Sequence, residues 1–523
     1  MIIEVILTFI LLIYLFYRTK DAIHMAQQNL YDDDKRYFKW LNKNFNKLML
    51  GIELSQVLLI FLILFTNNGV VIPVLFFMVY SLLALRGYAL SKTTIVKQKL
   101  VVTSRVKRIL NTVFILYILI IYLLLKLNVY YYVIISALAY LQYYIVLIAI
   151  KINIPIEKCI YLSYKNKATR KLKSMNNLKV IGITGSYGKT SSKNILNDIL
   201  NVKYNSITTP KNLNTPYGLI ITINNILNKF DDIFIAEMGA YKRGEIKELC
   251  DIVHPSYGIL TRIGKAHLEL FGSQENIQKT KFELIESLPS DGVAVLNADD
   301  PLQVSYDLKN KVKIIWIGIE EEADFRAVNI NVTNKGTSFD LKMVNDNKLY
   351  HFETKLLGFA NIYNILAGIA LGYEFGISIN ELINAVKRVE QVPHRLELKK
   401  NYDVYYIDDA YNSNPVGAKM ALDILNLMSG KKIVVTPGMV ELGSIEDAEN
   451  EKFGENIADV CDEVILVGSK QTKAIYKGLK NKKYDEEHIY ILEDVSEAFK
   501  LIDKLKEDNT YVLLENDLPD IFK

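Results

Sequence analysis

Apolar residues dominate the first 150 positions of the chain, where polar residues separate long apolar runs. Five such runs occupy residues 2–17, 48–66, 70–90, 109–127 and 129–150. A helix needs about 20 apolar residues to cross the ~30 Å hydrocarbon layer of a bilayer, and four of the five runs reach that length. The pattern predicts a transmembrane bundle of about five helices over residues 1–150. A helical bundle buried inside a soluble protein is the alternative.

The first run and the connecting segments indicate how such a bundle is oriented. The start, Met1-Ile2-Ile3-Glu4, lacks the basic residues of a signal peptide and no small-residue cleavage site follows, which favours an uncleaved anchor. Basic residues gather between the first and second runs and between the third and fourth. Because positive charge stays cytoplasmic, we expect a multi-pass protein of the cell membrane, with the N-terminus outside and everything after Lys151 in the cytoplasm. We expect no charged cluster within the bundle that would mark a transport pathway.

A basic stretch follows at residues 151–178. Its basic residues are Lys151, Lys158, Lys165, Lys167, Arg170, Lys171 and Lys173, spaced among isolated apolar positions. This spacing predicts a juxtamembrane linker that lies as an amphipathic helix on anionic membrane lipid. A plain solvated linker is the alternative.

From residue 179 onward, short strand-like runs alternate with helical stretches. This alternation is typical of an α/β fold with a mostly parallel sheet. The length of 523 residues predicts about three domains in all. Strand-like runs at 432–436, 463–467 and 511–514 indicate that the last of them, residues 392–523, is a second α/β unit.

A glycine-rich turn lies between the first strand-like run of this region and the helical stretch after it. Residues 181–191 read Ile-Gly-Ile-Thr-Gly-Ser-Tyr-Gly-Lys-Thr-Ser. A strand, a tight turn and a helix N-terminus form a phosphate cradle, in which Lys189 reaches the terminal phosphates and the Thr190 hydroxyl can hold Mg²⁺. The full phosphate-loop pattern is not met, since Ile183 stands where its first glycine belongs. The shorter Gly-x-x-Gly-Lys-Thr pattern that remains still predicts nucleotide binding.

A carboxylate follows the strand-like run at 233–236. Glu237 stands directly after it. The carboxyl end of a central strand beside a phosphate loop is where Mg²⁺ needs an anionic ligand. His267 and Lys281 come later, and each alone is typical of an ordinary structural residue. Their order after Lys189 and Glu237 favours one common site.

Charge and cysteine content narrow the class of protein further. The formal net charge is only +4 and no basic–aromatic stripe is present, so we expect no nucleic-acid partner. The three cysteines, Cys159, Cys250 and Cys461, lie far apart and form no C-x-x-C pair. We expect them to be buried or inert thiols.

An ordered set of motifs carries a family resemblance. The motifs are Gly185-Ser186-Tyr187-Gly188-Lys189-Thr190, Thr209-Pro210-Lys211-Asn212-Leu213-Asn214-Thr215 with Gly218, Glu237-Met238-Gly239, Gly244-Glu245-Ile246, TRIGKAHLELFGS at 261–273, Thr280-Lys281-Phe282-Glu283, Gly358-Phe359-Ala360-Asn361-Ile362-Tyr363-Asn364, His394-Arg395-Leu396-Glu397, Asp408-Asp409-Ala410-Tyr411-Asn412-Ser413-Asn414-Pro415 and Glu441-Leu442-Gly443. Together they resemble the Mur ligases, which form amide bonds in bacterial cell-wall precursors, and are most similar to the MurF type, which adds D-Ala-D-Ala to UDP-MurNAc-tripeptide. The resemblance implies a central ATP-binding P-loop domain at 179–391 and a Rossmann-like C-terminal domain at 392–523.

The resemblance also implies roles for individual residues. The catalytic residues would be Lys189, Glu237, His267 and Lys281. Mg²⁺ would be held by Thr190, Glu237 and His267, and by Lys281, which stands where the family carries a carbamylated lysine. The ATP contacts would be Gly185, Ser186, Gly188, Lys189, Thr190, Ser191, Asn361, Asn364 at the adenine, Arg395 on phosphate and Asp409 near the ribose. The substrate contacts would be Asn212, Asn214, Thr215, Tyr411, Asn412 and Asn414.

This chain departs from the MurF pattern at several points. Arg262 replaces the usual Asn, and Ala360 replaces the usual His. Near the C-terminus, Leu514-Glu515-Asn516-Asp517-Leu518 stands where MurF-type enzymes tend to have a basic segment. Apolar helices stand where the family has a small soluble domain that grips the UDP-sugar. The chemistry is therefore implied by the resemblance, whereas the acceptor is not.

The implied reaction is the ligation of a carboxylate to an amine. ATP phosphorylates the carboxylate, and the amine displaces phosphate from the acyl phosphate. The expected partners are ATP, Mg²⁺, a UDP-linked or lipid-linked cell-wall precursor, and an amino acid or dipeptide. A polymer-forming ligase similar to poly-γ-glutamate synthases, or a pseudomurein ligase, is the first alternative. A transport ATPase or a non-catalytic nucleotide-binding membrane scaffold is a more distant one.

Overall fold

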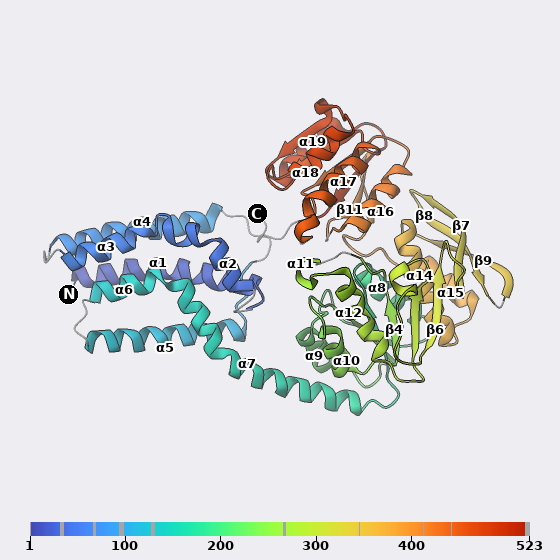
Figure 1. The fold of residues 1–523 in the computed structure, drawn as a ribbon, viewed down its shortest axis with the longest axis horizontal. Helices are drawn as coiled ribbons and strands as arrows, with labels where there is room; N and C mark the ends of the chain where they lie inside the picture. The colour runs from blue at the N-terminus through green and yellow to red at the C-terminus, as the bar shows by residue number, and fades with distance from the viewer. Residues whose placement is uncertain are drawn as a thin grey trace. The chain divides into compact units, whose positions relative to one another are not determined.

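The computed structural model describes residues 2–31, 36–65, 70–93, 99–126, 131–264, 268–344, 346–411, 413–440 and 442–517. The chain divides between Leu162 and Ser163 into two compact units (Figure 1). Each unit has hydrophobic cores of its own. The smaller unit contains the apolar N-terminal region, and the larger unit contains two β-sheets.

The N-terminal unit is built from helices. They are α1 (Ile2–Gln28), α2 (Phe38–Lys43), the π-helix η2 (Asn46–Leu50), α3 (Leu54–Phe65), α4 (Val71–Thr93), α5 (Ser104–Lys126), α6 (Tyr131–Tyr140) and α7 (Gln142–Lys173). Within the described residues, Val71–Lys92 and Ser104–Leu124 are long and apolar enough to cross a membrane. Helices α6 and α7 meet at a bend of 72° and would add a third span if they are counted as one, whereas α3 is apolar but shorter. A membrane bundle of five spans stays a prediction.

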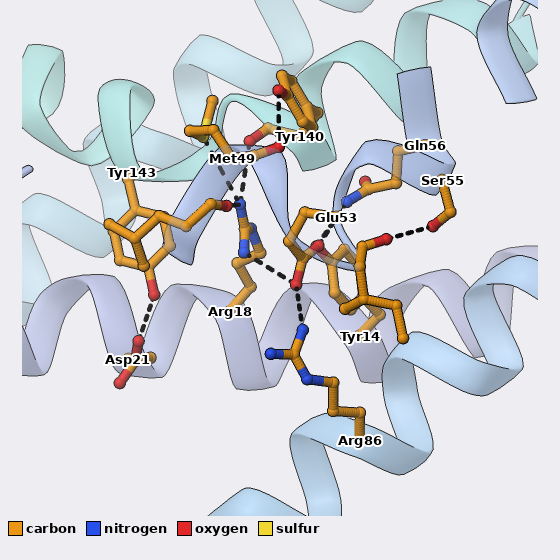
Figure 2. A network of polar contacts seen from close by, with 12 residues as sticks. Tyr14, Arg18, Asp21, Met49, Glu53, Ser55, Gln56, Arg86, Tyr140 and Tyr143 are labelled. Carbon is orange, nitrogen blue, oxygen red and sulfur yellow. Dashed lines mark hydrogen bonds and ion pairs between the residues drawn. The ribbon is translucent and has the colours of Figure 1, made fainter. Parts of the chain in front are cut away.

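A buried polar network joins the helices of this unit (Figure 2). The Glu53 carboxylate accepts hydrogen bonds from the Tyr14 hydroxyl at 2.5 Å and the Gln56 amide at 2.7 Å. Its other oxygen lies 3.2 Å from Arg18 and 3.4 Å from Arg86, and the side chains of Arg18 and Glu53 are only 6% and 8% exposed. The bundle therefore contains a charged cluster, contrary to expectation, because the fold brings Arg18, Glu53 and Arg86 together. The absence of a transport pathway stays a prediction.

The network connects segments that are far apart in the sequence. The Arg18 guanidinium donates to the backbone carbonyls of Leu48 at 3.0 Å and Tyr140 at 3.3 Å. It also lies 4.9 Å from the centre of the Tyr143 ring, and the Tyr143 hydroxyl donates to Asp21 (Figure 2). Helices α1, α3, α4, α6 and α7 and the turn η2 are thereby fixed around one buried ion pair.

Helix α7 carries the last apolar run into the basic stretch without a break. It contains Pro155 and extends to Lys173, so most of residues 151–178 is helical. Cys159 on this helix is exposed, whereas Cys250 and Cys461 in the larger unit are buried. Burial raises the pKa of the Cys250 thiol to about 12, which makes it inert as expected.

The first sheet of the larger unit has the strand order β2-β3-β1-β4-β5-β6-β7-β8-β9 in the described residues. All neighbours up to β7 are parallel, and β7, β8 and β9 form an antiparallel extension. Its strands are β1 (Lys179–Thr184), β2 (Ser206–Thr208), β3 (Ile233–Glu237), β4 (Tyr257–Leu260), β5 (Val293–Asn297), β6 (Lys313–Gly318), β7 (Phe325–Thr333), β8 (Gly336–Met343) and β9 (Asp346–Thr354). Its helices are α8 (Lys189–Leu200), α9 (Pro216–Asn225), α10 (Glu245–Val253), α11 (Leu268–Phe271), α12 (Gln274–Glu286), α13 (Pro301–Val304), α14 (Gly358–Glu374) and α15 (Ile379–Arg388).

Side-chain alternation along β1 explains the helix layers on the two faces of this sheet. Ile181 and Ile183 belong to a core shared with α8, α14 and α15. Gly182 faces the other way, where a Cβ would lie 2.5 Å from Leu284 of α12. Helices α9, α10 and α12 pack together as a second group (Figure 1). The carboxyl ends of β1, β3 and β4 therefore meet at one sheet edge between two helix layers, the usual place for a ligand.

The second sheet has the order β10-β11-β15-β12-β13-β14, with only the edge strand β10 antiparallel to its neighbour. Its strands are β10 (Glu397–Asn401), β11 (Val404–Asp409), β12 (Lys432–Thr436), β13 (Glu463–Val467), β14 (Ile489–Leu492) and β15 (Thr510–Glu515). Its helices are α16 (Pro415–Asn426), η3 (Gly443–Ile445), α17 (Glu446–Ala458), α18 (Lys473–Asn481), η4 (Glu486–His488) and α19 (Val495–Leu505). The predicted α/β fold with two mostly parallel sheets is confirmed.

Candidate active site

The phosphate loop is the turn between β1 and α8, and two of its positions require glycine. Gly185 has a φ of +152°, and a Cβ there would lie 1.9 Å from the Thr261 hydroxyl. Gly188 has a φ of +77° and directly precedes α8. A left-handed backbone and such a close approach both exclude larger side chains. The turn therefore leads directly into the N-terminus of α8, whose free N–H groups face the sheet edge.

The segment after β4 holds this loop in place. The Ser186 hydroxyl donates to the Gly264 carbonyl at 3.1 Å and accepts from the Gly264 N–H at 3.0 Å. The Thr261 hydroxyl donates to the Tyr187 carbonyl at 2.5 Å. The first half of the 261–273 motif thus supports the loop, and His267 in its second half lies outside the described residues.

Lys189 folds back over the loop that precedes it. Its ammonium donates to the carbonyls of Gly185 at 2.7 Å and Ser186 at 3.3 Å. Burial, opposed by the charge of Glu237 and assisted by that of Arg395, lowers the pKa of Lys189 to about 8. A bound phosphate would supply the negative charge that this lysine lacks.

We expect nucleotide affinity to depend on the protonation of Lys189. Below about pH 8 the lysine already carries its proton; above that pH, binding must be coupled to proton uptake. Affinity for a nucleoside triphosphate should therefore fall by up to about tenfold per pH unit above about pH 8. Calorimetric titration with a non-hydrolysable ATP analogue would measure this. The affinity for adenosine, which has no phosphate, should not change with pH. An affinity for the ATP analogue that is equally independent of pH would contradict the role of Lys189.

Glu237, at the carboxyl end of β3, is the centre of the site. One carboxylate oxygen accepts from the Thr190 hydroxyl at 3.2 Å and from the Asn214 amide at 3.0 Å. The other lies 2.9 Å from the Lys193 ammonium, and both of these side chains are 2% exposed. A hydroxyl and a carboxylate side by side are oxygen donors of the kind that Mg²⁺ prefers, so the donor set fits this ion.

A cavity of about 60 Å³ opens beside the phosphate loop and contains Lys281. Its lining consists of Gly185, Ser186, Lys189, Asn214, Gly239, Ala240, Tyr241, Phe271 and Lys281. Lys281, on α12, is 3% exposed, and its ammonium lies 5.6 Å from the centre of the Phe271 ring. Burial, together with the charge of Lys189, holds the pKa of Lys281 well below its ordinary value. A neutral amine, the nucleophilic form, is thereby favoured.

Two residues further along α12, Glu283 ties this helix to its neighbour. Its carboxylate accepts from the backbone N–H groups of Gly244 at 2.7 Å and Lys247 at 3.0 Å, at the start of α10. A carboxylate at a helix N-terminus is favourable for both hydrogen bonding and charge. Because Glu283 and Lys281 share one helix, this cap also fixes the position of Lys281.

A second cavity, of about 110 Å³, lies within the larger unit. Residues of the domain that contains the first sheet and residues of the domain that contains the second sheet both line it. The predicted nucleotide and substrate residues among its lining are Gly188, Ser191, Asn361, Asn364, Arg395, Asp409 and Asn414. Asn364 is close to the phosphate loop, since a Cβ on Gly188 would lie 3.1 Å from its amide oxygen. The phosphate loop therefore borders both cavities.

The C-terminal domain contributes a cation and a carboxylate to this second cavity. Arg395 lies 4.1 Å from the centre of the Tyr411 ring. The Asp409 carboxylate accepts from the Leu396 N–H at 3.2 Å. Burial raises the pKa of Asp409 to about 6, while the charge of Arg395 opposes the shift. A charged guanidinium and a carboxylate at one cavity suit a ligand with both anionic and hydroxyl groups.

The remaining predicted substrate residues are less uniform in position. Asn214 lines the first cavity, whereas Asn212 and Thr215 are exposed on the same loop. Thr215 caps α9 and Asn414 caps α16, so both have a structural role. Asn412 lies outside the described residues.

Sequence reasoning missed Lys193. It lies one helical turn after Lys189 on α8 and is buried against Glu237. The spacing of four residues was visible in the sequence. A lysine on a helix is usually solvated, however, so nothing in the pattern distinguished a buried one.

Two family descriptions match the larger unit. Residues 183–372 match the Mur ligase middle domain, and residues 394–515 match the Mur ligase, glutamate ligase domain. The UDP-N-acetylmuramoyl-tripeptide--D-alanyl-D-alanine ligase of Bacillus subtilis is 32% identical over 295 residues, which cover 55% of this chain and 63% of that protein. The ligase of the same name from Buchnera aphidicola subsp. Baizongia pistaciae is 30% identical over 349 residues, 63% of this chain and 75% of that protein. The chain thus spans less than two thirds of the Bacillus protein's length.

A solved structure agrees with these matches. The MurF ligase from Thermotoga maritima in complex with ADP superposes with a TM-score of 0.62 and 26% sequence identity. The match covers 68% of this chain and 80% of that one. The two curated relatives and this solved structure are all named as MurF-type ligases.

Proposed function

Because the chain belongs to the Mur ligase family, we propose that it is a MurF-like, ATP-dependent ligase that joins D-Ala-D-Ala or an amino acid to a cell-wall precursor. The observation that carries the proposal is the grouping of Lys189, the Thr190–Glu237 pair and Lys281 around one phosphate loop. A loop that only binds a nucleotide needs no buried lysine in an adjoining cavity. A ligase does, because a second reactant must meet the terminal phosphate there.

The residues suit transfer of a phosphoryl group to a carboxylate. The triphosphate and the substrate carboxylate repel each other, and Lys189 would offset part of that repulsion while orienting the terminal phosphate. Mg²⁺, held by Thr190 and Glu237, would neutralise further charge on the phosphates. The incoming amine would attack the resulting acyl phosphate, and phosphate would leave. Lys281, as a carbamate, would add an anionic ligand from the lining of the first cavity.

Membrane anchoring is part of the proposal. The support is the two described helices long and apolar enough to cross a membrane, together with the basic segments beside them. With the catalytic domains on the cytoplasmic side, the enzyme would act close to lipid-linked precursors. We therefore include a lipid-linked acceptor beside the UDP-linked one.

Phosphate release tests the reaction and the acceptor together. Detergent-purified protein would receive ATP, Mg²⁺ and D-Ala-D-Ala, with either UDP-MurNAc-tripeptide or its lipid-linked equivalent. Release that requires the dipeptide and the soluble precursor supports a MurF reaction. Release only with the lipid-linked acceptor supports substrate selection by the membrane unit. Release with neither would overturn the proposed substrates.

Replacing Asn364 with alanine should weaken nucleotide binding without unfolding the protein. The side chain lines the second cavity beside Gly188, and loss of one or two hydrogen bonds to a base lowers affinity by about tenfold. Calorimetry with a non-hydrolysable ATP analogue measures this, and circular dichroism checks the fold. Asn384→Ala, at an exposed position on α15, is the matched control. Equal affinities for Asn364→Ala and the control would reject the adenine assignment.

A further inference from the structure

Lys193 occupies a position that joins three parts of the site. It lies on α8, four residues after Lys189, so the two lysines share one helix face. Their ammonium groups point to different partners. Lys189 bonds to the phosphate loop, whereas Lys193 reaches the loop after β2 and the end of β3. The ammonium groups of Lys189 and Lys193, one helical turn apart, are therefore bound in different surroundings.

Three oxygen atoms surround the Lys193 ammonium. It donates to the carbonyls of Thr209 at 2.8 Å and Lys211 at 2.6 Å, and it lies 2.9 Å from a Glu237 carboxylate oxygen. An ammonium group has three N–H donors, and the two carbonyls accept two of them. The Glu237 oxygen is paired with Lys193 by charge and accepts no hydrogen bond among the described residues. Lys193 is 1% exposed, and a buried charge persists only with such compensation.

The loop that Lys193 holds carries part of the acceptor side of the site. Lys211 has a φ of +49°, a strained backbone conformation for a residue with a side chain, and its carbonyl is one of the two bonded to Lys193. Three residues later, Asn214 donates to Glu237 and its carbonyl accepts from the Gly239 N–H. The loop and Glu237 are thus fixed to each other on one side by Asn214 and on the other by Lys193.

We propose that Lys193 is a positioning residue that sets the geometry of Glu237 and of the 209–215 loop together. This inference rests on the proposed function. Lys193 touches neither cavity among the described residues, so it acts through the groups it holds. It would keep one Glu237 oxygen turned toward Thr190 for Mg²⁺ and keep Asn214 at the first cavity.

The test is the Mg²⁺ dependence of nucleotide binding, measured without turnover. With a fluorescent ATP analogue, Lys193→Met should need about 10- to 100-fold more Mg²⁺ for half-maximal binding, the usual cost of losing a residue that orients a metal ligand. Lys193→Gln retains a hydrogen-bond donor without the charge and should lie between Lys193→Met and the unaltered protein. Lys229→Met, an exposed lysine of the same domain, is the control and should not change the titration.

The direction in which Mg²⁺ affinity changes distinguishes a positioning role of Lys193 from simple charge compensation. If Lys193 only offset the charge of Glu237, its removal would make Mg²⁺ bind more tightly, and that result would overturn the positioning role. An unchanged titration in both variants would overturn it too. If Lys193→Met fails to fold by circular dichroism, Lys193→Gln decides by the same criteria. Failure of the proposed function is a separate result, since the unaltered protein would then bind Mg²⁺ and nucleotide but release no phosphate.

Discussion

Lys281→Ala is expected to reduce ligase turnover by about 10³-fold, the scale on which loss of a preorganised charged group at a reacting centre acts. Lys281 is buried in the first cavity, and its neighbour Lys189 disfavours a second positive charge there. The resulting neutral amine can add CO₂, forming a carbamate and releasing one proton. The carbamate would thus place an anion where the neutral amine stood, in the cavity beside the phosphate loop, and could serve as a ligand for Mg²⁺. Steady-state phosphate release measures the loss.

Chemical rescue distinguishes this role from a structural one. Acetate or formate should partly restore turnover in Lys281→Ala, because a small carboxylate fits the vacated space and replaces the carbamate charge. Lys279→Ala is the matched control, since Lys279 lies on the same helix, is 42% exposed and pairs only with Glu275 among the described residues. Full activity of Lys281→Ala without added carboxylate would remove the carbamate role.

Glu53→Ala is expected to lower the stability of the N-terminal unit by about 3–5 kcal/mol. The substitution leaves Arg18, which is 6% exposed, without its anionic partner. It also removes the acceptor for the Tyr14 hydroxyl and the Gln56 amide. Thermal unfolding of the detergent-purified protein can be monitored by the circular dichroism signal of its helices. The transition of the helical unit should occur at a lower temperature in Glu53→Ala.

A double substitution tests whether the uncompensated charge is the cause. Arg18→Met combined with Glu53→Met removes both charges and should recover most of the stability lost in Glu53→Ala. Glu451→Ala removes an ion pair with the exposed Lys477 in the larger unit and should leave the transition of the helical unit unchanged. A double variant as unstable as Glu53→Ala would mean that the hydrogen bonds to Tyr14 and Gln56, not the ion pair, stabilise the bundle.

The grouping of Arg18, Glu53 and Arg86 could not be predicted from the sequence. Arg18, Glu53 and Arg86 are separated by more than 30 residues from one to the next, and no local pattern joins them. Periodicity predicted the helices that carry them. Which helices pack together depends on long-range contacts such as those of α1 with α4 and α3 with α6, and these bring the charges into one place.

In the active site, too, some residues were predicted from local sequence patterns and others were found only in the folded structure. Gly188, Lys189 and Thr190 were predicted from a local pattern, because a strand, a glycine turn and a helix fix their geometry within a few residues. Glu237 was predicted from its place at the end of a second strand, and the parallel pairing of β1 with β3 brings it to the loop. Lys193 was not predicted, because its environment comes from the 209–215 loop. Thr215 and Asn414 were assigned to substrate by motif, and their capping of α9 and α16 became visible only in three dimensions.

The sequence by itself determined the elements of this protein: the apolar helices, the α/β alternation and the phosphate loop. These depend on hydrophobic period and backbone conformation, which are set by neighbouring residues. Only the tertiary structure decided which charges are buried and with what partners. The ion pairs of Glu53 and Glu237 and the burial of Lys281 depend on desolvation by distant segments. Burial of a charge is a property of the packed fold rather than of any stretch of the chain.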